Sequence, residues 1–185
     1  LLGDIGIARN LDSALYHFAV VIDDIAMEIS HVIRGEDHLS NTPKHILIYE
    51  ALGNSVPQYA HLPLLLGTDR SKLSKRNGQT SLNEYKKDYL PEVIINFLGT
   101  ISHTYGKEIL TQDELIEGFD LSKIHKSGAI FDIKKLDWMN AQYVRKLSPD
   151  ELRVVTGYSE IPDQAVPLIT ERLERLSGVV EFEYL

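Results

Sequence analysis

The sequence SHVIRGEDHLSNTPKHILIYEALG, residues 30–53, combines a short apolar segment with a well-marked helix. Its first six residues, SHVIRG (30–35), predict a short strand. The remainder predicts a helix with Thr42 as the N-cap and Pro43 at the first helical position. Gly53 lies just beyond the expected end, where a glycine commonly terminates a helix. A strand followed by a helix in this way favours an α/β fold.

Two further apolar segments flank this strand and helix. LYHFAVVID (15–23) is rich in β-branched and aromatic residues, which predicts a buried strand. HLPLLLG (61–67) predicts another short strand, which leads into a strongly basic loop. The expected order is therefore strand, strand, helix and strand, which is typical of an α/β sheet.

Beyond residue 70 the sequence carries repeated start signals for helices. Three Ser or Thr residues precede a Glu at the capping-box spacing: Ser81 and Glu84, Thr111 and Glu114, and Ser148 and Glu151. Pro91 opens a further helix in PEVIINFLG, which we expect Gly99 to close. Trp138, the only tryptophan, is expected in the core. We place a domain boundary near residue 70 and a weaker one near residue 148.

The composition limits the class of protein. The 185 residues are 43% hydrophobic and 25% charged, as in a soluble globular protein, and no apolar run approaches the roughly 20 residues that span a bilayer. The absence of cysteine excludes disulfides, thiol catalysis and Cys-type zinc sites. The seven histidines show no metal-ligand spacing, so we expect no metal site. A cytoplasmic location without membrane contact fits best.

Positive charge is concentrated in two places. The formal net charge of the chain is −8, yet residues 70–90 carry six Lys or Arg against two acidic residues, and residues 121–146 carry the same. Such basic islands suit contact with a polyanion, because phosphate attraction is screened within about 8–10 Å. Clusters of charge are equally often only solvated faces, so the pattern leaves both interpretations open.

The first island contains the loop GTDRSKLSKRNGQTS, residues 67–81. Lys72, Ser74 and Lys75 follow the end of a predicted strand, where α/β sheets tend to bind ligands. Two lysines on a loop flanked by glycines can close on a polyphosphate and neutralise charge that grows in a phosphoryl or nucleotidyl transfer. Surface lysines far outnumber catalytic ones, so the loop alone is a weak signal.

A series of longer segments strengthens the functional interpretation of this loop. KLSKR (72–76) resembles the KMSKS signature of class I aminoacyl-tRNA synthetases, in the form usual for glutamyl enzymes. The other matching segments are VIRGEDHLSNTPKHILIYEALG (32–53), PQYAHLPLLLG (57–67), SLNEYKKDYLPEVIINFLG (81–99), SGAIFDIKKLDWMN (127–140) and YVRKLSPDEL (143–152). They occur in the family's order and spacing and cover essentially the whole chain. By this resemblance, the chain is identified as a member of the bacterial-type glutamyl-tRNA synthetases.

The resemblance implies a fold, α/β followed by mostly α. Residues 1–70 would be the second half of a Rossmann-type catalytic domain. Residues 71–148 would hold the lysine-signature loop and a helical stem-contact domain, and residues 149–185 the start of a helical anticodon-binding region. The chain would then be an internal fragment, since no HIGH signature occurs and it neither starts with Met nor reaches a complete anticodon domain.

The resemblance also implies a reaction and its partners. L-glutamate attacks the α-phosphate of ATP, which is bound with Mg²⁺, to give glutamyl-adenylate and pyrophosphate. The glutamyl group then passes to the 3′ end of a glutamate-accepting tRNA. No zinc is implied for this part of the enzyme. Two other interpretations remain, a glutamyl-queuosine tRNA synthetase and a non-catalytic tRNA-binding module.

Site residues follow from the matched motifs. The resemblance assigns catalysis to Lys75, Lys72 and Ser74, ATP binding to Lys75, Lys72, Asp37 and Leu65, and glutamate binding to Arg34 and Tyr16. The planar guanidinium of Arg34 suits a carboxylate, although an ion pair with Glu36 or Asp37 is the structural alternative. Tyr16 would by default be a core aromatic residue. It follows LDSAL (11–15), which lacks the glycine and proline of the family's usual turn, so its placement is open.

Overall fold

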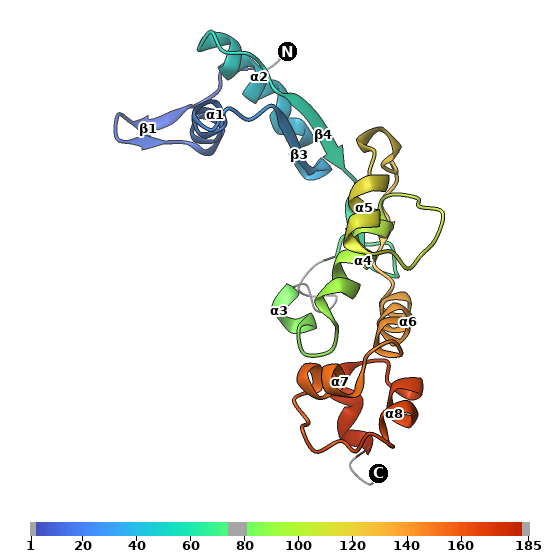
Figure 1. Ribbon diagram of the computed structural model, residues 1–185. Coiled ribbons are helices and arrows are strands. Elements are labelled where there is room, and N and C mark those ends of the chain that lie inside the picture. The colour runs from blue at the N-terminus through green and yellow to red at the C-terminus, as the bar shows by residue number, and fades with distance from the viewer. Residues whose placement is uncertain (1–2, 74–80, 183–185) are drawn as a thin grey trace. The chain divides into compact units, whose positions relative to one another are not determined.

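A computed structural model describes residues 3–73 and 81–182 of the chain, coloured along the sequence in Figure 1. The chain divides into two compact units, Leu1–Leu64 and Leu65–Leu185. Ser74 and Lys75, two of the predicted catalytic residues, lie outside the described residues. None of the helices in the described ranges is long and apolar enough to cross a membrane.

The first unit is built around a small parallel sheet (Figure 1). Its elements are β1 (Ala8–Asn10), β2 (Ser13–Ala14), α1 (Tyr16–Ala26), β3 (His31–Gly35), the 3-10 helix η1 (Glu36–Asn41), α2 (Thr42–Ala51) and β4 (Gln58–Leu62). β3 and β4 pair in parallel, with His31 opposite Gln58 and Gly35 opposite Leu62. Since parallel neighbours need a crossover, η1 and α2 supply it. The strand and helix predicted within residues 30–53 are therefore confirmed.

The strand predicted at residues 15–23 is wrong, because α1 occupies that segment. The β-branched run suggested a strand, but Phe18, Val21, Ile22 and Ile25 follow the i, i+3, i+4, i+7 spacing of a helix face. Val21 is fully buried, with Phe18 and Ile25 packed around the same small cluster. A window of nine residues was too short to separate the two periods.

The ends of α2 differ slightly from the prediction. The helix begins at Thr42 itself, with Asn41 in the N-cap position and proline in the first turn. The Thr42 hydroxyl therefore makes no cap and is available to other partners. At the far end Gly53 has φ +70°, as predicted for a glycine that follows a helix. The Tyr49 hydroxyl then ties α2 to α1 by donating to Asp24 at 3.3 Å.

The turn that lacks the usual glycine and proline is closed in another way. β1 and β2 form an antiparallel hairpin, and the Asn10 side chain accepts a hydrogen bond from the Asp12 backbone N–H at 3.0 Å. An Asn side chain can form a turn by this two-residue bond. The Leu15 N–H also donates to the Ile7 carbonyl at 2.8 Å, so α1 starts at Tyr16 directly from the hairpin.

The second unit is mostly helical. Its elements are β5 (Leu65–Leu66), α3 (Leu82–Tyr85), α4 (Pro91–Ile101), α5 (Gln112–Gly118), the 3-10 helix η2 (Leu121–Lys123), β6 (Ala129–Ile130), α6 (Ile133–Val144), α7 (Pro149–Thr156), α8 (Val166–Arg172) and the 3-10 helix η3 (Leu176–Phe182). All three predicted capping boxes are present, at the starts of α3, α5 and α7. β5 pairs in parallel with β6, which leads into α6.

Helix α6 crosses the apolar core of this unit. Leu136, Met139 and Val144 of α6 are fully buried among residues of α4, α7 and α8. Trp138, predicted in the core, is 43% exposed on the same helix, so that prediction is wrong. Gly99 does not close α4, which continues to Ile101. A β-carbon at position 99 would lie 3.0 Å from the Leu115 side chain, so the glycine permits close packing of α5.

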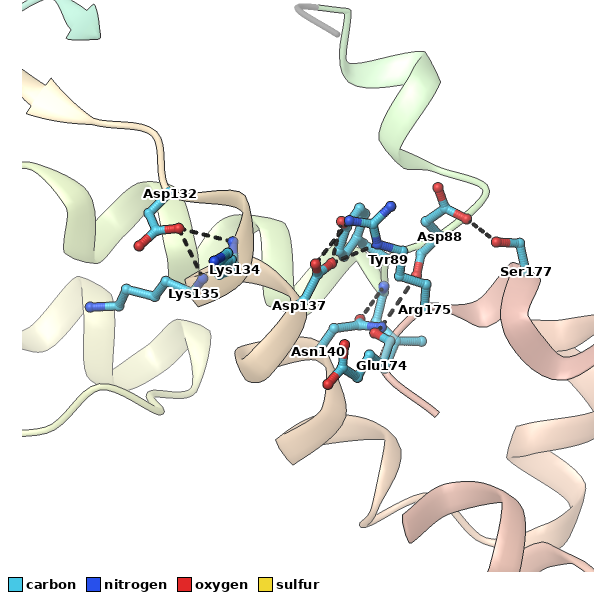
Figure 2. A network of polar contacts seen from close by, with 11 residues as sticks. Asp88, Tyr89, Asp132, Lys134, Lys135, Asp137, Asn140, Glu174, Arg175 and Ser177 are labelled. Atoms are coloured by element: carbon cyan, nitrogen blue, oxygen red, sulfur yellow. Dashed lines mark hydrogen bonds and ion pairs between the residues drawn. The ribbon is translucent and has the colours of Figure 1, made fainter. Parts of the chain in front are cut away.

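A buried carboxamide joins two other segments of the chain to α6 (Figure 2). Asn140 is fully buried, and its Oδ1 accepts from the Leu90 N–H at 3.1 Å. Its Nδ2 donates to the Asp88 carbonyl at 3.2 Å and to the Glu174 carbonyl at 2.7 Å. These backbone groups precede α4 and η3, so one side chain satisfies groups that no helix could pair.

An ion pair lies beside it. Arg175 donates from Nε and Nη2 to the two carboxylate oxygens of Asp137 at 2.7 and 2.8 Å, and the Tyr89 hydroxyl donates to Asp137 at 2.6 Å. Burial alone would raise the pKa of Asp137, but these hydrogen bonds bring it below its ordinary value. The contacts of Asn140 with Glu174 and of Asp137 with Arg175, both drawn in Figure 2, therefore fasten α6 to the C-terminal segment.

Replacing Asn140 with Leu is expected to destabilise the second unit. The change leaves one buried N–H and two carbonyls without their partner, at about 1–3 kcal/mol for each unsatisfied group, so we expect a loss of about 3 kcal/mol or more. Urea unfolding, followed by the fluorescence of Trp138, measures the effect. The exposed Asn54→Leu variant is the control, and an equal midpoint for both variants would contradict the role of Asn140.

The Asp137 ion pair is expected to lose its effect in acid. Because the folded-state pKa of Asp137 is lowered, its stabilisation is present above the unfolded pKa of about 3.9 and is lost as the pH falls through the folded pKa. Asp137→Asn should therefore destabilise the chain at pH 7 and have progressively less effect below about pH 4. Unfolding curves at several pH values test this, and a destabilisation that does not change with pH would refute it.

Candidate functional site

Arg34 is the centre of the polar side of the first unit. It lies in β3 directly opposite His61 of β4, so both side chains project from the same face of the sheet. Tyr59, two residues before His61, shares that face, and the guanidinium carbon of Arg34 lies 5.2 Å from the centre of its ring. The parallel register thus places a cation over an aromatic ring and beside an imidazole.

Among the described residues, every group that accepts a hydrogen bond from Arg34 is neutral. Its Nη2 donates to Thr42 Oγ1 at 2.8 Å and to the His38 carbonyl at 3.4 Å. Its Nη1 lies 3.3 Å from His45 Nδ1, and its Nε donates to His61 Nε2 at 3.4 Å. The Thr42 hydroxyl left free by the helix start is thus used here, 3.0 Å from His61 Nε2.

Of the two ion pairs that were the structural alternative for Arg34, the one with Glu36 is not formed. Glu36 Oε1 accepts a hydrogen bond from the Leu64 backbone N–H at 3.2 Å. Asp37 lies in η1, and its Oδ1 folds back over Gly35, where a β-carbon would meet it at 2.5 Å. The guanidinium is therefore a half-buried cation whose charge none of these hydrogen-bond partners balances.

Tyr16 lies beside the same group of imidazoles. It is the first residue of α1 and is 53% exposed, so it is not a core aromatic residue. Its ring centre lies 6.3 Å from that of His38 and 6.1 Å from that of His45. Since His45 also contacts Arg34, the two residues expected at the glutamate site lie around one imidazole.

The electrostatics favour the neutral form of three of the surrounding imidazoles. Burial lowers the pKa of three of them, and the nearby guanidinium lowers each pKa further. The three are His17, His45 and His61, and the pKa of His45 falls to about 4. At neutral pH the cluster therefore presents one fixed positive charge among uncharged donors and acceptors, an arrangement that suits a carboxylate ligand.

The basic loop starts from an ordered base in the second unit. Leu66 and Lys72 form an antiparallel backbone bridge, and the Leu73 N–H donates to the Leu65 carbonyl at 2.9 Å. Between them Arg70 takes a left-handed conformation with φ +62°. Leu65 and Lys72, both expected at the ATP site, are therefore held together by backbone bonds, with Lys72 exposed.

The Asp69 side chain closes the same turn. Its Oδ1 accepts from the Ser71 N–H at 2.9 Å and from the Ser71 hydroxyl at 2.8 Å, and these bonds lower the pKa of Asp69. Gly67 and Ser71 are further joined by a backbone bond of 2.9 Å. Because β5 also pairs with β6, the base of the loop is fastened to the segment that enters α6.

Sequence reasoning missed several residues of this site. His17, His45 and Thr42 contact or support Arg34, and His61 was given no role. The signal for Thr42 and His45 was their spacing of three in α2, which puts both side chains on one helix face. His61 could not be found from spacing, because its place opposite Arg34 depends on the strand register.

Comparison with known proteins places these features in a family. A sequence profile described as "tRNA synthetases class I (E and Q), catalytic domain" matches residues 2–138. A glutamate–tRNA ligase of Natranaerobius thermophilus is 50% identical over 154 residues, which cover 82% of this chain and 32% of that protein. A glutamate–tRNA ligase of Hydrogenobaculum sp. is 45% identical over 187 residues, 99% of this chain and 38% of that protein. The chain thus spans about a third of the length of the curated relatives it matches.

Solved structures agree with the sequence match. The glutamate–tRNA synthetase of Elizabethkingia anophelis has a TM-score of 0.86 at 33% identity, covering 99% of this chain and 43% of that one. A glutamate–tRNA ligase of Elizabethkingia meningosepticum, solved in complex with its amino acid, gives 0.83 at 33% identity, with 96% and 42% covered. The expected fold is confirmed, and the chain belongs to the class I tRNA synthetases of the glutamate and glutamine (E and Q) family, whose catalytic domain its residues 2–138 match.

Proposed function

We propose that the chain is part of a glutamate–tRNA ligase, which uses ATP to convert L-glutamate into glutamyl-adenylate and transfers the glutamyl group to a glutamate-accepting tRNA. The observation that carries this proposal is Arg34, a fixed cation whose described hydrogen-bond partners are all neutral. An anionic amino acid would supply the missing negative charge, and a guanidinium can hold a carboxylate with two parallel bonds. Relatives named glutamate–tRNA ligase match nearly the whole chain, which supports the same choice.

Glutamate would be held from two sides. Arg34 would bind a carboxylate of the substrate, and the exposed Tyr16 would contact it from the start of α1. A carboxylate oxygen of glutamate would then attack the α-phosphorus of ATP, and the bond to the pyrophosphate would break. Tyr16 carries a hydroxyl donor that suits a carboxylate, which is the reason to place it at this position.

The ATP site would be formed by the basic loop and its base. Lys75 and Lys72 would neutralise charge that develops on the phosphates, and Ser74 would add a hydroxyl donor. Leu65 would lie near the adenine and Asp37 near the ribose. ATP would enter as its Mg²⁺ complex, since Mg²⁺ is commonly held by substrate phosphates.

The proposed domain plan follows the family. Residues 1–70 would complete the catalytic domain, residues 71–148 would contact the tRNA stem, and residues 149–185 would begin an anticodon-binding region. The similarity to curated ligases continues beyond the lysine signature to cover up to 99% of the chain. This extent favours the ligase over a glutamyl-queuosine synthetase, whose resemblance is expected to end soon after that signature.

Glutamate-dependent exchange of pyrophosphate with ATP tests the proposal. Because the chain spans about a third of its relatives, the assay uses the complete polypeptide that contains it. We expect exchange with L-glutamate in the presence of the cognate tRNA and little with glutamine or aspartate. Binding of tRNA without any exchange would favour the non-catalytic module and would overturn the proposed ligase.

Replacing Arg34 with Lys is expected to weaken glutamate binding. Lysine keeps the charge but loses the planar pair of donors, and a hydrogen bond to a charged group contributes about 1.5–3 kcal/mol. We therefore expect the KM for glutamate to rise about 10- to 100-fold, with little change in the KM for ATP. The exposed Arg9→Lys variant is the matched control. Equal KM values for both variants would remove Arg34 from the glutamate site.

Replacing Lys75 with Ala is expected to slow adenylate formation. The ammonium would meet charge that grows in the transition state, so its loss should fall on kcat, by about 100- to 1,000-fold as for single oxyanion-hole donors. Lys87→Ala, which removes an exposed lysine from the same basic island, is the control. Single-turnover adenylate formation measures the rate, and a raised KM for ATP with unchanged kcat would show that Lys75 binds only ground-state nucleotide.

A further inference from the structure

Arg34 determines which way hydrogen bonds run through its neighbours. A guanidinium has five N–H donors and no acceptor, and it stays protonated in proteins. The contact of 3.3 Å between Arg34 Nη1 and His45 Nδ1 therefore requires Nδ1 to accept. An imidazole that accepts at Nδ1 is neutral and carries its proton on Nε2.

The same requirement passes to a second imidazole. His45 Nε2 lies 3.0 Å from His17 Nδ1, and since Nε2 is the donor in this tautomer, His17 Nδ1 must accept. His17 is then also neutral, with its proton on Nε2. A chain of two imidazoles, both with the same tautomer, thus runs from β3 through α2 to α1.

His45 has the surroundings that this role requires. It is buried at 1% exposure, unlike the exposed Tyr16 beside it, and its two ring nitrogens are both occupied by the bonds described. The charged or titratable groups that face it are Arg34 from β3, His17 and Tyr16 from α1, His38 from η1 and Lys44 from its own helix. Each charge among them is positive, so protonation of His45 is opposed from several sides.

We propose that His45 is a positioning residue that orients the Arg34 guanidinium toward the substrate carboxylate while leaving its charge unbalanced. A carboxylate in the place of His45 would fix the guanidinium equally well, but it would compete with the substrate for the charge. A neutral acceptor fixes the orientation of the guanidinium but does not compete with the substrate for its charge. This inference rests on the proposed function, since it takes glutamate as the ligand of Arg34.

Two variants separate positioning from simple packing. The side chain of glutamine offers an oxygen acceptor beside an N–H donor, as the neutral His45 tautomer does, whereas leucine fills space and offers neither. In the complete polypeptide, His45→Leu is expected to raise the KM for glutamate about ten-fold or more while the KM for ATP changes less than about three-fold. His45→Gln is expected to restore the KM for glutamate to within about three-fold of the unsubstituted enzyme. His31→Gln, an exposed site in β3, is the matched control.

The outcomes are distinguishable from those for the ligase itself. Absence of glutamate-dependent exchange in the unsubstituted enzyme would overturn the proposed function and, with it, a role for His45 toward glutamate. Normal exchange with an unchanged KM for glutamate in His45→Leu would overturn only the role of His45. An equal rise of the KM for glutamate in His45→Leu and His45→Gln would also overturn it, because the effect would then come from packing and not from hydrogen bonding.

If His45→Leu does not fold, the protonation of the His45 ring in the unsubstituted protein tests the proposal instead. Nitrogen NMR of the unsubstituted protein labelled at histidine distinguishes a protonated from an unprotonated ring nitrogen. At pH 7 we expect His45 and His17 each to show an unprotonated Nδ1 and a protonated Nε2. A protonated Nδ1 on His45 would overturn the proposal, because Arg34 could not then donate to it.

Discussion

A guanidinium can only donate hydrogen bonds, and this constraint orders the polar side of the first unit. Arg34 needs acceptors in the plane of its fork, and the fold supplies them from separate elements. The parallel register brings His61 from β4, and the first turn of α2 brings Thr42 and His45. Each acceptor depends on a different feature of local structure, so the correct packing of strands and helix is itself a condition for satisfying the guanidinium.

The two units treat the charge of an arginine in opposite ways. Arg175 of the second unit meets both oxygens of the Asp137 carboxylate, and its charge is balanced within the protein. Among the described residues, Arg34 meets imidazole, hydroxyl and carbonyl groups, which accept from its donors and do not balance its charge. A partly buried cation without a counter-charge is unfavourable in the free protein, because desolvation is not offset by an ion pair. An anionic ligand removes that cost, so the unfavourable arrangement becomes part of the binding energy.

Sequence reasoning succeeded where a signal is local and failed where it depends on distant residues. The capping boxes at Ser81, Thr111 and Ser148 involve only four neighbouring residues, and the structure forms all three. The segment at 15–23 was assigned to a strand because its β-branched residues outweighed a helical spacing that extends to Ile25. In the site, motif resemblance identified Arg34, but His61 reaches it only through a strand register that no local pattern encodes.

In the basic loop, a charged side chain extends from a backbone that is already held in place. A lysine on a long flexible side chain loses considerable rotamer entropy when it is held against a ligand. The backbone at Lys72 is fixed beforehand, by the bridge to Leu66 and by the turn that the Asp69 side chain closes. In the proposed ATP site, only the side-chain freedom of Lys72 would then remain to be lost on binding. The left-handed conformation of Arg70 is a local strain that the surrounding bonds of this turn hold in place, as is common where the backbone positions a functional group.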